Sequence, residues 1–297
     1  MMQWLKKFCL PSELKASGVL GMNARNYKII AKNNNRRLYP LVDDKVQTKK
    51  LAAKAGINTP KLIGVIEYQH QVKDFVKLIA EHPQFVIKPA HGSGGKGVLV
   101  VKQWSDNKFI TASGKVLTFQ DVYKHISNTL SGLFSLGGQY DVALIEEMVH
   151  FSNMFKNFSY QGTAESGGRA NLHQGAVGVG LDIKTGKTLN AVMHNVPITT
   201  HPDTGADLKT LVVPNWREHL LIGAKSYEMT GLGYLGADIV MDEDSGPMML
   251  ELNARPGLAI QIANGNGLIN AIKKIDKTYP HNLTAEERVD FILNQAK

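Results

Sequence analysis

The sequence predicts an α+β fold, in which helices are combined with mostly antiparallel strands. Short β-branched strands flank a glycine-rich loop, as in FVIK (85–88) and VLVV (98–101). A hairpin pattern covers 236–253, and segments with helical periodicity lie between the strands. This mixture favours α+β lobes over a doubly wound parallel sheet.

The elements follow in order along the chain. QTKKLAAKAG (47–56) reads as a short helix ended by Gly56, and 71–82 carries apolar residues at helical spacing. The segment 119–130 is predicted to be helical, and 141–149 to be a buried strand that ends in two acids. The segment 151–171 is polar and glycine-rich, with no clear period. The rest is read as strands at 175–183 and 188–195, a helix at 217–231, the hairpin 236–253 and two C-terminal helices.

The composition is that of an ordinary globular protein, with 297 residues and a net charge of +8. Residues 1–50 hold eleven Lys and Arg against three acids. This basic front would bind an anionic membrane face or an acidic partner, or form a solvated helix surface that attracts a polyanionic substrate. No apolar run suits a membrane helix or a secretion signal, so we expect a cytoplasmic protein. Cys9 is the single cysteine, and no nucleic-acid-binding motif is found.

The glycines of FVIKPAHGSGGKGVLVV (85–101) raise the question of which phosphate this loop binds. A Rossmann loop leads into a helix, but here Gly97 is followed by a β-branched strand. A Walker A loop needs Ser or Thr after its lysine, and Lys96 precedes Gly97. A glycine loop between two strands can still cover a nucleotide, with its backbone N–H groups facing phosphate oxygens. Lys88 would then hold the phosphates from the strand side.

The C-terminal hairpin supplies a candidate metal site. If its turn centres on Asp244 and Ser245, Asp238 falls opposite Glu251, and Asn253 lies on the same face. Two carboxylates and an amide oxygen suit Mg²⁺, with Mn²⁺ as a substitute. The alternative is a solvent-facing acidic pair. The apolar strands around both acids favour the metal, because unpaired acids in apolar surroundings are costly.

Taken together, these motifs resemble the ATP-grasp superfamily. The resemblance rests on DDK, FVIKPAHGSGGKGV, LIEEMV, NLHQGA, HNVPITTHPDTG, GYLGADIV and LELNARPGL, between about 21 and 268. Within the superfamily the sequence is most similar to the α-L-glutamate ligase-like branch, related to the enzyme that adds glutamates to ribosomal protein S6. The resemblance implies two α+β lobes with a nucleotide between them and a truncated N-terminal α/β lobe. It divides the chain into a basic helical segment (1–43), an ATP-binding lobe (44–150) and a Mg²⁺ and substrate lobe (151–297).

The resemblance also implies roles for particular residues. Glu146 and Glu147 would read the adenine and ribose, and Asp238, Glu251 and Asn253 would bind Mg²⁺. Arg255 would face the acyl-phosphate or the incoming substrate, beside Asn171 and His173. Lys45 could instead pair with Asp43 or Asp44 at the surface, and His173 could be structural. The residues implied to contact the phosphates of ATP are Lys45, Lys88, His91, Gly92, Ser93, Gly94, Gly95, Lys96 and Gly97.

The implied reaction joins a carboxylate to an amine such as that of glutamate, through an acyl-phosphate, with release of ADP. The chain departs from the family because 148–170 is short and lacks a D-x-R motif, which leaves Arg169 as its sole arginine. Two other functions therefore stay open, a nucleotide-binding regulatory protein without turnover and a phosphotransferase. The substrate site of the missing N-terminal lobe would come from a partner or from a homo-oligomer.

Overall fold

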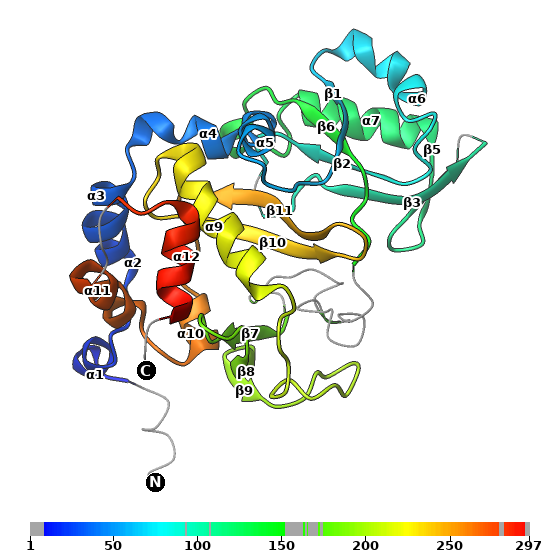
Figure 1. The fold of residues 1–297 in the computed structure, drawn as a ribbon. Coiled ribbons are helices and arrows are strands. Elements are labelled where there is room, and N and C mark those ends of the chain that lie inside the picture. Colours follow the sequence, from blue (N-terminus) through cyan, green and yellow to red (C-terminus); the bar gives the residue numbers. More distant parts are fainter. Residues whose placement is uncertain are drawn as a thin grey trace. The chain divides into compact units, whose positions relative to one another are not determined.

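The computed structural model describes residues 9–92, 94–106, 108–151, 163, 165, 172, 175–278 and 282–294. The chain divides into two units. Unit 1 comprises Met1–Asn35, Phe151–Gly236 and Ala254–Lys297, and unit 2 comprises Arg36–His150 and Ala237–Asn253. Each unit combines helices with antiparallel strands, which confirms the α+β class (Figure 1). None of the helices described is both long and apolar enough to cross a membrane.

Unit 2 is built on a six-stranded antiparallel sheet with the strand order β1-β6-β2-β3-β4-β5. A second sheet pairs β10 with β11, the predicted hairpin. By its contacts the hairpin belongs to unit 2, although the sequence suggested the 151–297 lobe. The strands are β1 (Leu62–Ile66), β2 (Phe85–Pro89), β3 (Leu99–Ser105), β4 (Lys108–Thr111), β5 (Val116–Thr118), β6 (Ala143–Glu146), β10 (Gly236–Asp242) and β11 (Gly246–Asn253). The α-helices are α4 (Pro40–Asp43), α5 (Lys45–Lys54), α6 (Phe75–Leu78) and α7 (Phe119–Leu130).

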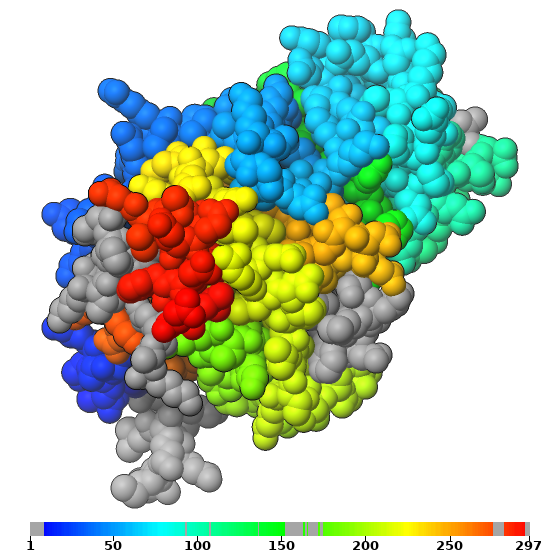
Figure 2. Space-filling view, viewed as in Figure 1, coloured from blue at the N-terminus to red at the C-terminus, as the bar shows by residue number. Residues whose placement is uncertain are grey.

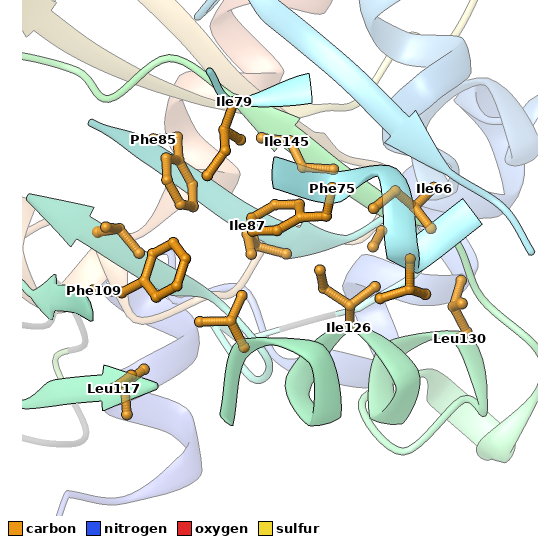
Figure 3. Packing of buried hydrophobic residues seen from close by; sticks show 14 residues of the cluster. Ile66, Phe75, Ile79, Phe85, Ile87, Phe109, Leu117, Ile126, Leu130 and Ile145 are labelled. Atoms are coloured by element: carbon orange, nitrogen blue, oxygen red, sulfur yellow. The ribbon is translucent and has the colours of Figure 1, made fainter. Parts of the chain in front are cut away.

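Helix α7 packs on one face of the large sheet and has the bounds that the sequence predicts. Its first turn is capped reciprocally, because Asp121 accepts a hydrogen bond from the Thr118 backbone (2.8 Å) and Thr118 Oγ1 accepts one from the Asp121 backbone (3.3 Å). Ile126 and Leu130 point from α7 toward the sheet (Figure 3). They meet a fully buried aromatic cluster, in which the Phe85 ring lies 5.6 Å from the ring of Phe75 and 6.3 Å from that of Phe109.

The alternation of side chains along β2 and β6 separates the core from the opposite face. Phe85 and Ile87 enter the core, so Lys88 lies on the other side of the sheet. In β6, Ile145 pairs with Ile87 in the core, which places Glu146 on the face of Lys88. The same alternation that builds the core therefore gathers charged groups on the opposite face.

The segment 71–82 differs from its predicted single helix. A 3₁₀-helix covers Gln69–Asp74, and α6 adds only Phe75–Leu78. The Gln71 side chain accepts hydrogen bonds from the backbones of Glu67 (2.7 Å) and Tyr68 (2.9 Å), which stabilises the tighter first turn. Apolar spacing alone does not reveal such a local side-chain cap.

Unit 1 has a three-stranded antiparallel sheet with the order β7-β8-β9, and α10 packs against β7 and β8. Helices α9 and α12 lie side by side, and Figure 2 shows the red surface of α12 beside the yellow surface of α9. In place of two C-terminal helices, the chain ends with α10, α11 and α12. The elements are α1 (Pro11–Ala16), α2 (Met22–Ala24), a π-helix (Arg25–Ile30), α3 (Ala31–Asn33), β7 (Gly178–Leu181), β8 (Thr188–Met193), β9 (Val196–Ile198), α9 (Trp216–Thr230), α10 (Ile260–Asn264), α11 (Leu268–Thr278) and α12 (Ala285–Asn294).

Candidate functional site

Two buried lysines share one buried glutamate in unit 2. Lys88 Nζ lies 2.6 Å from Glu146 Oε2, and Lys49 Nζ lies 2.9 Å from Oε1. The Glu146 side chain is only 3% exposed. Among the described groups, Oε1 has no well-directed hydrogen bond despite the short distance to Lys49. The cluster thus carries one more positive than negative charge, away from bulk water.

Strand ends and one helix face place these groups. Lys88 lies near the end of β2 and Glu146 ends β6, while Lys49 comes from α5. Asp44 caps α5 by accepting hydrogen bonds from the backbones of Val46 (2.8 Å) and Gln47 (3.3 Å). Lys45 and Lys49 are four residues apart on this helix and therefore share a face.

Burial changes the acidity of Lys49. Loss of hydration lowers its pKa, while the negative charge of Glu146 acts in the opposite direction and Lys88 adds to the lowering. The ammonium also donates to Thr59 Oγ1 (3.3 Å) and to the Pro60 carbonyl. A further anion beside this lysine would therefore stabilise its charged form.

Lys45 connects the start of the glycine loop to β11. Its Nζ donates hydrogen bonds to the carbonyls of Gly92 (2.6 Å) and Ala90 (3.4 Å), and lies 3.5 Å from Glu251 Oε2. Only 14% of its side chain is exposed, so the alternative of a surface ion pair does not describe its position.

Asp238 on β10 and Glu251 on β11 are neighbouring carboxyls; Asp238 is exposed, and the Glu251 side chain is 33% exposed. Partial loss of hydration and the neighbouring Glu251 raise the pKa of Asp238 to about 6, while Lys45 opposes the shift. Two adjacent carboxylates form an oxygen donor pair that suits a divalent cation. In the described part of the chain no third Asp, Glu, His or Cys joins them, and Asn253 ends the same strand two residues after Glu251. Mg²⁺ is often bound by one or two carboxylates together with substrate phosphates, so this donor set fits it.

The lysine cluster, Lys45 and Glu251 line one pocket in unit 2, whereas Asp238 and Asn253 are not among its lining residues. The sequence identified four of the lining residues, Lys45, Lys88, Glu146 and Glu251, and missed Lys49. The signal that could have revealed Lys49 was its spacing of four residues from Lys45. The lysines around it read as a solvated helix surface, which hid this signal. The lining residues are Lys45, Thr48, Lys49, Thr59, Lys88, Glu146, Met249, Leu250 and Glu251.

Glu147, predicted to act beside Glu146, contacts other groups. Its carboxylate lies 3.3 Å from Lys61 Nζ and 3.7 Å from His82 Nδ1, and 42% of the side chain is exposed. Neighbouring residues at a strand end point to opposite sides, which separates the two acids.

The glycine loop has a left-handed backbone at Gly94, Gly95 and Gly97, where φ is 63°, 71° and 75°. A side chain is strained in this region, so glycine is required there. Lys96 is exposed, and Ser93 lies outside the described residues. His91 and Gly92 form the start of the loop.

The loop that carries Arg255 is held at three carbonyls in unit 1. Asn34 Nδ2 donates to the carbonyl of Ala254 (3.0 Å), Arg25 Nη1 to that of Pro256 (2.8 Å), and Gln261 Nε2 to that of Leu258 (3.3 Å). Arg255 itself is exposed. The other predicted catalytic residues, Arg169, Asn171 and His173, lie outside the described residues.

A family model described as sugar-transfer associated ATP-grasp matches residues 24–165 and 161–277. The chain belongs to the sugar-transfer associated ATP-grasp family. The match covers both halves of the pocket, the lysines of 45–88 and the hairpin 236–253. No curated protein matches the chain.

Three solved structures are similar to the chain, one of them at a TM-score of 0.50. Phosphoribosylamine–glycine ligase from Thermotoga maritima is 16% identical, with a TM-score of 0.50, 89% of this chain covered and 61% of that one. D-alanine–D-alanine ligase from Helicobacter pylori is 15% identical (TM-score 0.45, 81% and 62% covered), and the ATP-grasp ligase PsnB is 13% identical (TM-score 0.42, 82% and 61% covered). The chain thus spans about three fifths of the length of these three proteins. The ATP-grasp fold predicted from the sequence is confirmed.

Proposed function

We propose that the protein is an ATP- and Mg²⁺-dependent ligase that joins a carboxylate to an amine. The observation that carries the proposal is the buried cluster of Lys49, Lys88 and Glu146, with its excess positive charge beside the Asp238–Glu251 pair. Such a cluster suits a polyanion, and membership of an ATP-grasp family makes ATP the leading candidate.

The reaction would proceed in two balanced steps. A carboxylate oxygen attacks the γ-phosphorus of ATP, so that an acyl-phosphate forms and ADP leaves. The amine nitrogen then attacks the acyl carbon, phosphate leaves, and a proton is released to form the amide. Lys45, Lys49 and Lys88 would neutralise the phosphate oxygens during transfer. Asp238, Glu251 and Asn253 would hold Mg²⁺, which supplies further charge neutralisation.

The family description supports a narrower choice of substrate. Because the family is associated with sugar transfer, we propose that one reactant is attached to a sugar, as in a uronic acid or an amino sugar. The resemblance to glutamate ligases makes glutamate the first amine to test. The exposed Lys15, Lys28 and Lys32 of the N-terminal segment would attract an acidic acceptor or an anionic membrane face.

The test is ADP release with Mg²⁺-ATP and paired panels of acids and amines, including uronic acids, amino sugars and glutamate. The product is checked by mass spectrometry for the sum of acid and amine less one water. The near-isosteric double variant Asp238→Asn/Glu251→Gln is the inactive control. Amine-dependent turnover that the double variant abolishes supports the ligase. A stable phosphorylated acid formed without any amine would indicate a phosphotransferase, and nucleotide binding without turnover a regulatory protein.

A further inference from the structure

Asp141, which lies two residues before β6, is a fully buried carboxylate that joins three segments of unit 2. It accepts hydrogen bonds from the His91 backbone (3.0 and 3.2 Å) and contacts the His91 ring at Nδ1 (2.8 Å). It also accepts from the Val142 backbone (2.7 Å) and from the Ser135 hydroxyl. One side chain thus connects the first residue of the glycine loop to β6 and to the turn around Ser135.

The same turn supports the rest of the loop. Gly92 forms an isolated β-bridge with Ser135, and the carbonyl of Gly97 lies 3.0 Å from His125 Nε2. A Cβ added to Gly97 would come within 2.5 Å of the Phe134 ring, so the loop passes close over that side chain. The start of the loop (His91 and Gly92) and its end (Gly97) are therefore both held by residues of the segment 125–141.

The middle of the loop is different. A Cβ at Gly94 or Gly95 would meet nothing within 4 Å, so crowding does not explain the glycines there. Their left-handed backbone does, since successive N–H groups in such conformations form concave sites for anions. Donors of this kind stabilise developing charge only when their direction is fixed beforehand. The attachments at the base of the loop supply that fixed direction.

We propose that Asp141 is a positioning residue for phosphate binding, which orients the glycine loop through His91. The inference rests on the proposed function, because it takes the phosphates of ATP as the ligand of the loop. Asp141 does not line the pocket and contacts no group of the lysine cluster in the described structure. Its effect on the nucleotide would pass through the loop backbone alone.

The test compares wild type with Asp141→Asn by calorimetric titration of Mg²⁺-ATP and by hydrogen exchange. In wild type, Mg²⁺-ATP should protect the amides of both 91–97 and 45–49. In Asp141→Asn we expect affinity about tenfold weaker, since one of the two carboxylate oxygens that accept these bonds becomes an NH2 donor. Protection of 91–97 should be lost while that of 45–49 persists. Asp121→Asn is the matched control, because Asp121 accepts hydrogen bonds only from Thr118 in the described structure.

Wild-type affinity and wild-type loop protection in Asp141→Asn would overturn the role of Asp141 and leave the proposed function intact. Absence of Mg²⁺-ATP binding by the wild-type chain would reject both. If Asp141→Asn does not fold, Ser135→Ala decides the question, because it removes one hydrogen bond to the same carboxylate. We then expect affinity about threefold weaker with reduced loop protection, and an unchanged loop would overturn the proposal.

Discussion

The carboxylate of Glu146 and the ammonium of Lys88 lie 2.6 Å apart on the side of the sheet opposite its apolar core. Lys49 approaches the same carboxylate from α5. In the free protein Glu146 therefore occupies the position of an anion between two cations. If ATP binds here, its phosphates either displace this carboxylate from the two ammonium groups or bind them beside it. The following predictions test that relationship.

Removal of either lysine should weaken nucleotide binding. We expect Lys49→Ala and Lys88→Ala each to weaken Mg²⁺-ATP binding roughly ten- to a hundredfold, because each deletes a charged hydrogen-bond donor from a buried site. Lys61→Ala is the matched control, since Lys61 is 72% exposed and pairs with Glu147. Calorimetric titration measures the affinities. Equal affinities for all three variants would contradict the assignment of this pocket to the nucleotide.

Replacement of the shared acid should destabilise the fold. Glu146→Gln leaves two buried ammonium groups without a counter-charge, so we expect a loss of about 3 kcal/mol in the free energy of unfolding. Glu147→Gln, one residue away and 42% exposed, should change it by less than about 0.5 kcal/mol. Urea unfolding of both variants checks this. A similar loss of unfolding free energy in both variants would show that the burial of Glu146 does not make its charge more important for stability than that of Glu147.

The stability of unit 2 should depend on Asp141 in acid. Burial would raise the pKa of this carboxyl, but hydrogen bonds from Ser135, Val142 and His91 together lower it below its ordinary value of 3.8. A folded-state pKa below the unfolded value contributes stability that is present above the unfolded pKa and is lost as the pH falls through the folded pKa. As the pH falls below about 5, the unfolding free energy should therefore fall less steeply in Asp141→Asn than in wild type. Equal slopes of unfolding free energy against pH in wild type and Asp141→Asn would contradict this linkage.

The aromatic cluster should dominate the core of unit 2. Phe85→Ala removes a fully buried ring that contacts the rings of Phe75 and Phe109, and we expect a cost of about 3–5 kcal/mol. Val116→Ala serves as the control, because Val116 is 58% exposed on the edge strand β5. Thermal unfolding of both variants measures the difference, and a small effect of Phe85→Ala would indicate that the core closes around the cavity.

Several elements could be predicted because local and global signals agree. The helix 119–130 combines a capping box with strong periodicity, and the hairpin 236–253 brings Asp238 and Glu251 into contact as strand pairing suggested. The segment 71–82 could not be predicted in detail, because the Gln71 side chain redirects the backbone locally.

The site was only partly visible in the sequence for similar reasons. Lys49 was hidden in a lysine-rich helix, since charge alone does not tell a buried cation from a solvated one. The opposite directions of Glu146 and Glu147 could have been inferred from strand alternation. The role of Asp141 could not, because its partners His91 and Ser135 are brought to it by the fold. The predicted roles of Arg169, Asn171, His173 and Arg255 stay predictions.

The N-terminal segment should stabilise the loop that follows β11. Asn34 exchanges two hydrogen bonds with the Tyr234 backbone (2.7 and 2.9 Å) and donates one to Ala254. Asn34→Ala should lower the free energy of unfolding by about 1–3 kcal/mol, because these backbone groups lose buried partners. Asn23→Ala, an exposed position in α2, is the control. Faster hydrogen exchange at 254–258 in Asn34→Ala would confirm the connection, and unchanged exchange would contradict it.

The three carbonyl contacts of the 254–258 loop constrain how this protein can be recombined with its relatives. Arg25 and Asn34 supply two of them, and Gln261, which supplies the third, also accepts the backbone N–H of Leu20 at 2.7 Å. A chimera that exchanges the hairpin and its following loop without residues 20–34 would separate these donors from their acceptors. Residues 20–34 and 254–261 therefore form one unit of exchange, and the family match that begins at residue 24 leaves out Leu20, which contacts Gln261 in that unit.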